Sequence, residues 1–171
     1  MIYLVEDDAS ISDLESYALK SAGFEVCAFA DSDSFRRALQ QSKPDLVILD
    51  WMLPGESGND ILEKLRKTQP YKTLPVIMLT AKNLEEQRAE GYEHGADSYI
   101  TKPFYSKVLL ARINNLLKQR RLLKSLFKDI TQADEQTIDQ SSMDDRDKQF
   151  MKQLHHIIQS NLSRSEFGVE D

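Results

Sequence analysis

The sequence feature that most constrains the fold is a series of five short apolar runs separated by stretches of helical periodicity. The runs occupy residues 2–5, 26–29, 46–49, 76–79 and 99–100. Each run is almost continuously apolar and lacks the polar alternation of a strand with one face in water, so strands covered on both faces are expected. Right-handed βαβ crossovers produce that arrangement. The pattern therefore predicts an α/β fold with a five-stranded parallel sheet.

The helices expected between the strands cover residues 10–21, 34–41, 58–67 and 84–94. Ser57 stands three residues before Asp60, which is the spacing of a capping box that satisfies free N–H groups in a first helical turn. Gly23 and Gly95 follow helical stretches, where a residue in the left-handed conformation commonly ends a helix. A longer helix is expected from Ser106 onward.

The composition narrows the classes of function. The 171 residues include 22 Lys and Arg against 28 Asp and Glu, and the formal net charge of −6 argues against broad nucleic-acid affinity. The single cysteine, Cys27, cannot form an internal disulfide, and the N-terminus lacks the basic segment of a secretion signal. No apolar run approaches the roughly 18 residues of a membrane-spanning helix. A cytoplasmic protein with no membrane partner is expected.

Polar side chains follow four of the predicted strands. Glu6 and Asp7 follow the first strand, Asp50 the third, Thr80 the fourth and Lys102 the fifth. In a flavodoxin-like, doubly wound (βα)5 sheet of strand order 2-1-3-4-5, ligands bind beyond the carboxyl ends at the switch point between strands one and three. Adjacent strands lie about 4.8 Å apart. We therefore expect Asp7 and Asp50 to converge there, with Thr80 beside them and Lys102 reaching in.

Converging carboxylates indicate a bound cation. Asp7 and Asp50 would repel each other, and a carboxyl pKa would rise, unless a cation joins them. An all-oxygen site suits Mg²⁺, which keeps some waters and leaves positions for phosphoryl oxygens. A carboxylate, a divalent metal, a lysine and a hydroxyl are the components of phosphoryl transfer. A phosphoryl group on Asp50 would add charge that Mg²⁺, Lys102 and Thr80 satisfy only by closing on it, which describes a switch.

Four stretches of sequence, in order, resemble the receiver domains of two-component response regulators. They are LVEDD at 4–8, VILDWMLPG at 47–55, MLTA at 78–81 and GADSYITKPF at 95–104. The resemblance covers residues 2–121, and the second stretch is most similar to OmpR-type regulators. It implies a module that accepts a phosphoryl group from a histidine kinase and controls an output such as transcription. It also implies that the chain is not an enzyme, apart from slow self-dephosphorylation.

The resemblance implies roles for the acidic residues. Asp50 would be the phosphoacceptor, which attacks a phosphohistidine of the kinase to form an acyl phosphate. Asp7 would bind Mg²⁺ directly, and Glu6 would act nearby or through water. Asp50 and the backbone carbonyl of Met52 would complete the set of metal ligands.

The resemblance also implies roles for the switch residues. Lys102 would pair with the phosphoryl group, and its bond to Pro103 is expected to be cis, an isomer found almost only before proline. The hydroxyl of Thr80 would move to bond a phosphoryl oxygen, and the ring of Tyr99 would turn inward when it does. The surface formed by helix four, strand five and helix five would then shift.

Two surfaces are candidates for a homodimer. OmpR-type regulators dimerise through the face of helix four, strand five and helix five by interlocking ion pairs, for which Asp97 and Arg112 are expected to be available. Ser98 and Val108 stand where that group often has acidic residues. The other candidate is the extended helix at 106–130, which carries an apolar heptad seam. The seam residues are Leu109, Ile113, Leu116, Leu123, Phe127 and Ile130.

The predicted organisation has three regions: a receiver domain at 1–121, a helical extension and acidic linker at 122–146, and a helical fragment at 147–171. The last region resembles the start of the AraC-type DNA-binding domain of hybrid two-component proteins. The sequence ends before a helix-turn-helix could form. DNA binding is therefore expected only through an output domain absent from this chain, which would be a shortened or a joined sequence.

Three other classes of function fit the sequence less well. A haloacid-dehalogenase-like phosphatase also uses an aspartate nucleophile and Mg²⁺, but it needs a second acid two residues later, where Met52 stands. A pseudo-receiver, a protein-interaction module that carries no phosphate, usually lacks the acidic pair or the lysine, and this sequence has both. A DNA-binding protein is opposed by the net charge. The receiver interpretation is favoured over all three.

Overall fold

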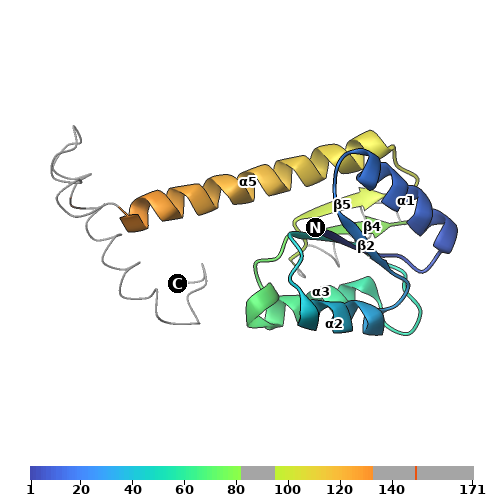
Figure 1. Cartoon of the computed structure of the whole chain (residues 1–171). Coiled ribbons are helices and arrows are strands. Elements are labelled where there is room, and N and C mark those ends of the chain that lie inside the picture. The colour runs from blue at the N-terminus through green and yellow to red at the C-terminus, as the bar shows by residue number, and fades with distance from the viewer. Residues whose placement is uncertain (82–94, 133–148, 150–171) are drawn as a thin grey trace. The chain divides into compact units, whose positions relative to one another are not determined.

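The computed structural model describes residues 1–81, 95–132 and 149 of the chain (Figure 1). The chain divides into two compact units, Met1–Lys118 and Gln119–Asp171. All of the strands described below belong to the first unit, and one helix, α5, crosses from the first unit into the second. The predicted boundaries at 121 and 146 stay predictions.

The elements alternate between strand and helix along the first unit. The strands are β1 (Ile2–Val5), β2 (Val26–Phe29), β3 (Leu46–Asp50), β4 (Val76–Thr80) and β5 (Ser98–Thr101). The helices of the described residues are α1 (Ala9–Ser21), α2 (Ser32–Gln41), α3 (Gly58–Lys67), the short 3₁₀ helix η1 (Gln69–Tyr71) and α5 (Ser106–Gln132). The predicted helix at 84–94 lies outside the described residues.

The five strands form one parallel sheet in the order β2-β1-β3-β4-β5, as predicted. The order reverses direction between β1 and β3, so the carboxyl ends of these two neighbouring strands border the switch point. In the register of the sheet, Val5 pairs with Leu49 and Asp50 pairs with Leu79. The residues that follow β1 therefore lie next to the end of β3.

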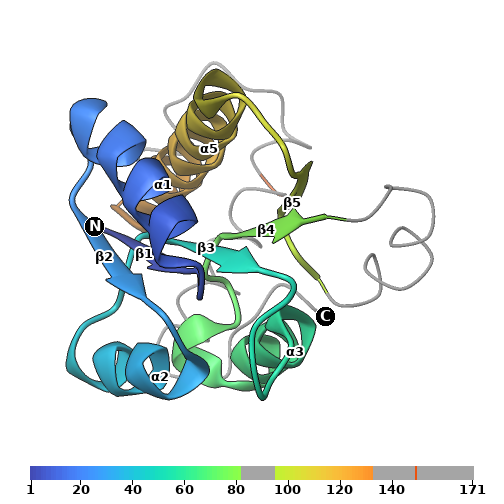
Figure 2. The same cartoon turned by 90° about the vertical axis from the view of Figure 1, so that its right-hand side faces the viewer.

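Helices cover both faces of the sheet, with α2 and α3 on one side and α1 and the start of α5 on the other (Figure 2). Successive strand residues point to opposite faces. In β1, Tyr3 and Val5 pack with Phe35 of α2, whereas Leu4 packs with Leu19 of α1 and Leu109 of α5. Each such buried side chain contributes about 1.5–3 kcal/mol. The continuously apolar runs arise because both faces are covered.

Side-chain caps set the starts of three helices. Asp8 accepts hydrogen bonds from the backbone N–H groups of Ser10 and Ile11 at 2.8 and 3.0 Å, so α1 begins one residue earlier than predicted. Asp31 caps α2 in the same way, and this helix begins two residues early. The capping box of Ser57 and Asp60 is present at α3, as predicted.

The helix α5 begins at Ser106, as predicted, and continues to Gln132. Of the side chains on its seam, Leu109 and Ile113 are buried against the sheet, whereas Leu123 is exposed. Among the residues that the structure describes, no helix combines the length and the apolar character that crossing a membrane requires.

Asp97 is exposed and is also bonded within its own chain, and its use in ion pairs across a dimer stays a prediction. One of its carboxylate oxygens, Oδ2, accepts from the guanidinium of Arg66 at 2.9 Å and from the backbone N–H of Val76 at 2.8 Å. Arg66 also donates to the backbone carbonyls of Leu74 and Gly95, both at 2.8 Å. The pair joins α3 to the start of β4 and the segment before β5.

Candidate functional site

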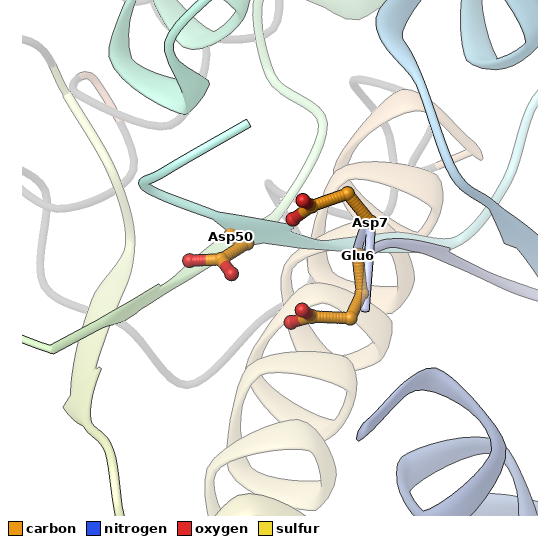
Figure 3. A group of neighbouring side chains, drawn as sticks. All are labelled: Glu6, Asp7 and Asp50. Atoms are coloured by element: carbon orange, nitrogen blue, oxygen red, sulfur yellow. The ribbon is translucent and has the colours of Figure 1, made fainter. Parts of the chain in front are cut away.

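Three carboxyl groups gather at the switch point of the sheet. Glu6 and Asp7 directly follow β1, Asp50 ends β3, and ligand oxygens from the three lie within 4.8 Å of one another (Figure 3). Glu6 and Asp50 are 2% and 7% exposed, whereas Asp7 is exposed to solvent. The predicted convergence of Asp7 and Asp50 is therefore confirmed, and Glu6 lies in the same cluster.

Lys102 reaches this cluster from β5, two strands away from β3. Its ammonium group donates to Asp50 Oδ2 at 2.8 Å and also to Glu6 Oε2. The backbone N–H of Lys102 donates to the carbonyl of Thr80 at 2.6 Å, which fixes the start of the loop after β5. The bond between Lys102 and Pro103 is cis, as predicted. One cation therefore bridges two of the three carboxylates.

Burial and charge shift the pKa values of two of these groups in the same direction. Burial, assisted by the negative charge of Asp50, raises the pKa of Glu6, although the bond from Lys102 opposes the rise. Burial also disfavours the ammonium form of Lys102, but its bonds to Asp50 and Glu6 outweigh this effect, so the pKa of Lys102 is raised. The lysine therefore stays charged at neutral pH and serves as the counter-ion of the cluster.

The backbone around Asp50 is tightly built. The N–H of Met52 donates to Asp50 Oδ1 at 3.2 Å, and the N–H of Trp51 donates to the carbonyl of Leu79 at 2.8 Å. Gly58, the first residue of α3, approaches the strand so closely that a Cβ atom there would lie 2.1 Å from the backbone oxygen of Asp50. The position requires glycine, because any larger residue would displace the end of β3.

The remaining predicted site residues lie near this edge of the sheet. Thr80 ends β4 and is fully buried, one position beyond the residue that pairs with Asp50. Tyr99 lies in β5 and is half-buried. Met52 follows β3, and its side chain is 65% exposed. The structure brings together Glu6, Asp7, Asp50 and Lys102, and the roles assigned to Thr80, Tyr99 and Met52 stay predictions.

Sequence reasoning missed Glu15, a buried carboxyl group on α1 that is 6% exposed. Burial, together with the negative charges of Glu6 and Asp50, raises its pKa to about 7, against the smaller opposing effect of Lys102. The sequence does contain a pattern that indicates the burial of Glu15. Glu15 stands four residues from Ile11 and four from Leu19, so it interrupts an apolar helix stripe.

The chemistry of the acidic cluster fits a hard divalent cation. Three carboxylates from Glu6, Asp7 and Asp50 offer only oxygen ligands, and two of the three are buried. Such donors suit Mg²⁺, which is commonly held by one or two carboxylates with waters completing its shell. The exposed Asp7 leaves one side of the cluster open to solvent.

A family model for the response regulator receiver domain matches residues 2–114. The chain belongs to this family. Receiver domains are signalling modules that interact with histidine kinases, bind Mg²⁺ at an acidic cluster and are typically not enzymes. The family assignment and the flavodoxin-like fold predicted from the sequence are thereby confirmed.

Relatives of this receiver include transcriptional regulators. It is 43% identical over 118 residues to the phosphate regulon transcriptional regulatory protein PhoB of Escherichia coli (strain K12), covering 69% of this chain and 52% of PhoB. The response regulator DrrB, a Thermotoga maritima OmpR/PhoB homologue, is 34% identical with a TM-score of 0.62, covering 70% of this chain and 52% of DrrB. The chain thus spans about half the length of these two proteins.

A solved receiver structure also resembles this chain. The receiver domain of the sensor histidine kinase PA1611 from Pseudomonas aeruginosa PAO1 is 26% identical with a TM-score of 0.63, covering 68% of this chain and 96% of that domain. That structure holds a magnesium ion in its active-site cleft. The predicted AraC-type tail falls almost entirely on residues outside the described part of this chain and stays a prediction.

Proposed function

We propose that this receiver accepts a phosphoryl group from a histidine kinase on Asp50 and transmits the change to a transcriptional output. In the reaction, a carboxylate oxygen of Asp50 forms a bond to phosphorus while the bond between phosphorus and the kinase imidazole breaks, and the imidazole keeps the electron pair. The observation that supports the proposal is the buried Asp50 carboxylate, whose Oδ2 lies 2.8 Å from the Lys102 ammonium within an acidic cluster.

The contacts of Lys102 support a role for it in the transfer. Its ammonium group, held between Glu6 and Asp50, neutralises the acceptor before transfer. We propose that it pairs with the phosphoryl oxygens afterwards, because a phosphorylated aspartate carries more negative charge than the carboxylate that it replaces. Thr80 would then bond a phosphoryl oxygen and Tyr99 would turn inward, so that the face of helix four, strand five and helix five changes shape.

We propose Mg²⁺ as the cofactor, held by Asp7 and Asp50, by the backbone carbonyl of Met52, and by Glu6 nearby or through water. The support is the three-carboxylate cluster and the magnesium ion of the similar PA1611 receiver. Bound there, Mg²⁺ would neutralise charge on the transferring phosphoryl oxygens. Trp51 is the single tryptophan of the chain and directly follows Asp50, so its fluorescence should report binding.

The Mg²⁺ proposal is tested by measuring Mg²⁺ binding to the wild type and to an Asp7→Asn variant. Wild-type Trp51 fluorescence should change saturably with Mg²⁺, and Asp7→Asn should weaken the apparent affinity about tenfold or more because it removes a negatively charged ligand. Asp13→Asn, at an exposed acid on α1, is the matched control and should bind as the wild type does. Equal affinities for Asp7→Asn and the wild type would exclude Asp7 as a ligand.

We further propose that the protein works in the cytoplasm and regulates transcription through a DNA-binding output domain, as a homodimer formed by the face of helix four, strand five and helix five or by the helix at 106–130. Leu123 is exposed on that helix. Sedimentation of the wild type and of a triple variant tests the second surface. The variant carries Leu123→Ser, Phe127→Ser and Ile130→Ser. A dimer mass for the wild type and a monomer mass for the variant would support this surface. Monomer masses for both proteins would exclude it.

Phosphoryl transfer is tested by treating the protein with Mg²⁺ and a small phosphodonor such as acetyl phosphate and measuring the intact mass. The wild type should gain one phosphoryl group, and Asp50→Asn should gain none. Asp45→Asn is the matched control, because Asp45 is an exposed acid near the opposite end of β3 and should not affect uptake. Absence of uptake by the folded wild type would favour a pseudo-receiver.

The phosphatase alternative receives no support from the site. Such an enzyme needs a general acid two residues after its aspartate, and Met52 occupies that position with an exposed, non-titrating side chain. The proposed activity is therefore phosphoryl storage rather than turnover, apart from slow self-dephosphorylation.

A further inference from the structure

A second hollow in the first unit has no role in the proposed phosphoryl chemistry. It is a cavity of about 380 Å³ between α1 and the segment that leads from β5 into α5. That volume falls within the range of small-molecule pockets, about 300–1,000 Å³. Its walls are mainly apolar: Ile11, Leu14 and Ala18 on α1, and Pro103, Phe104 and Leu109 on the other side.

The cavity also contains a buried carboxyl group that lacks a partner. Glu15 lines it, and among the described residues its Oε2 atom is buried and accepts no hydrogen bond. A buried carboxylate without a hydrogen-bond donor is costly, so such a group is normally paired or protonated. Within the described part of the chain, Oε2 of Glu15 is therefore an unsatisfied acceptor.

The nearby lysine does not fill this role. Lys102 lines the same cavity, but its ammonium group donates to Asp50 and to Glu6. Three carboxylates and one ammonium leave that neighbouring cluster with an excess of negative charge even before Glu15 ionises. A cation entering the cavity would therefore be favoured over an anion, and the apolar walls would accept a hydrocarbon body.

We propose that this cavity binds a small organic cation, in which an ammonium or amidinium group donates to Glu15 and an aliphatic or aromatic body packs between α1 and the start of α5. The cationic group supplies the missing donor. The body buries apolar surface against Leu14, Phe104 and their neighbours. The inference requires neither a metal nor a phosphoryl group, so it goes beyond the proposed function and does not depend on it.

The pKa of Glu15, raised to about 7 by burial, gives the binding a pH dependence. The charged groups that act on Glu15 are Lys102, Glu6 and Asp50. Near neutral pH a protonated fraction of Glu15 would have to release its proton when a cation binds. Affinity should therefore rise between about pH 6 and about pH 8, while the cation itself stays charged.

Benzylamine is the probe for the test, and benzyl alcohol is its neutral counterpart. Each is titrated into the full chain while backbone amide resonances are followed by NMR. Benzylamine should cause saturable shifts centred on α1 and residues 103–109. Benzyl alcohol should bind at least about tenfold more weakly, because a hydrogen bond between two charged groups is lost.

Variants provide the second half of the test. Glu15→Gln keeps the shape of the side chain but removes its charge, and it should weaken benzylamine binding at least about tenfold and abolish the pH dependence. Glu25→Gln, at an exposed acid, is the matched control and should bind like the wild type. Equal binding of amine and alcohol, or of the Glu15→Gln and wild-type proteins, would overturn the proposal. So would the absence of saturable shifts at these residues. Should Glu15→Gln fail to fold, the amine and alcohol comparison in the wild type decides.

Discussion

The ammonium group of Lys102 lies 2.8 Å from a carboxylate oxygen of Asp50, although the two residues are 52 positions apart in the sequence. The same ammonium group donates to Glu6, which is 96 positions away. Three strands of one parallel sheet bring these residues to the same edge, so the contact exists only when the whole sheet has formed. The ionic contact to Asp50, the proposed phosphoryl acceptor, therefore also contributes to the stability of the domain.

Lys102→Ala should destabilise the domain by about 3 kcal/mol, at the low end for breaking a buried ion pair, because the lysine is partly exposed. The variant leaves Glu6 and Asp50 without their counter-ion. Added Mg²⁺ should therefore raise the melting temperature of the variant more than that of the wild type, since binding to the folded state stabilises it. Thermal unfolding with and without Mg²⁺ measures both effects.

Lys67→Ala is the matched control for that experiment. Lys67 pairs with Glu63 on the surface of α3, and exposed pairs of this kind contribute at most about 0.5 kcal/mol. Its response to Mg²⁺ should equal that of the wild type. A Lys102→Ala protein that is as stable as Lys67→Ala would mean that the carboxylates do not need the ammonium.

Glu15 should make the protein less stable as the pH rises from about 4.5 to about 7. Its pKa is higher in the folded than in the unfolded state, so the folded protein binds the proton more tightly. The resulting stabilisation is complete below the unfolded pKa and is lost as the pH rises through the folded pKa, a loss on the order of 3 kcal/mol. Other acids titrate in the same window, so the difference between the wild type and Glu15→Gln isolates the effect.

Denaturant unfolding at a series of pH values measures that difference. The free energy of unfolding of Glu15→Gln relative to the wild type should increase with pH over this range and level off above it. Parallel curves for the two proteins would show that Glu15 does not titrate with a raised pKa.

Gly58→Ala should cost about 2–3 kcal/mol, because the added methyl group would meet the backbone oxygen of Asp50, and overpacking has costs of that size. The displaced end of β3 should also slow phosphoryl uptake. Gly23→Ala separates this effect from backbone strain. Gly23 has a positive φ of 86° with nothing near its missing Cβ, so its substitution should cost only about 1 kcal/mol. Chemical denaturation of both variants compares the costs, and equal costs would contradict the close approach.

Arg66→Ala should destabilise the domain by about 2–3 kcal/mol, because it removes the donor of backbone carbonyls and one of the two donors to the carboxylate of Asp97. Arg66→Lys should recover little of this loss, since a lysine cannot reproduce the planar fork of donors. Arg37→Ala, at an exposed arginine, should stay within about 0.5 kcal/mol of the wild type. Full rescue by lysine would indicate that charge alone matters.

The strands and the polar residues at their ends were predictable because apolar runs and strand-end polar residues are local features of the sequence. The strand order was instead taken from the flavodoxin-like fold class. Asp7 and Asp50 converge as a direct consequence of parallel pairing. The bond between Asp97 and Arg66 could not be predicted, because the two residues lie 31 positions apart and no local pattern links them. The need for Gly58 could not be predicted either, since it depends on how sharply the chain turns after β3.

Glu15 lies between these cases. Its place on an apolar helix stripe could have indicated burial, but whether its Oε2 atom finds a partner among the described residues depends on the whole cavity wall. A residue that breaks a local pattern can thus be noticed in the sequence, but its contacts are known only from the structure.

The central claim is that Asp50 is the residue that carries the phosphoryl group. The most direct measurement is to treat the protein with Mg²⁺ and acetyl phosphate, reduce the acyl phosphate with borohydride, which converts a phosphorylated aspartate to homoserine, and sequence the peptides. The account predicts homoserine at position 50 and at no other position. Homoserine at Asp7 or elsewhere, with residue 50 still aspartate in a protein that has gained a phosphoryl group, would contradict it.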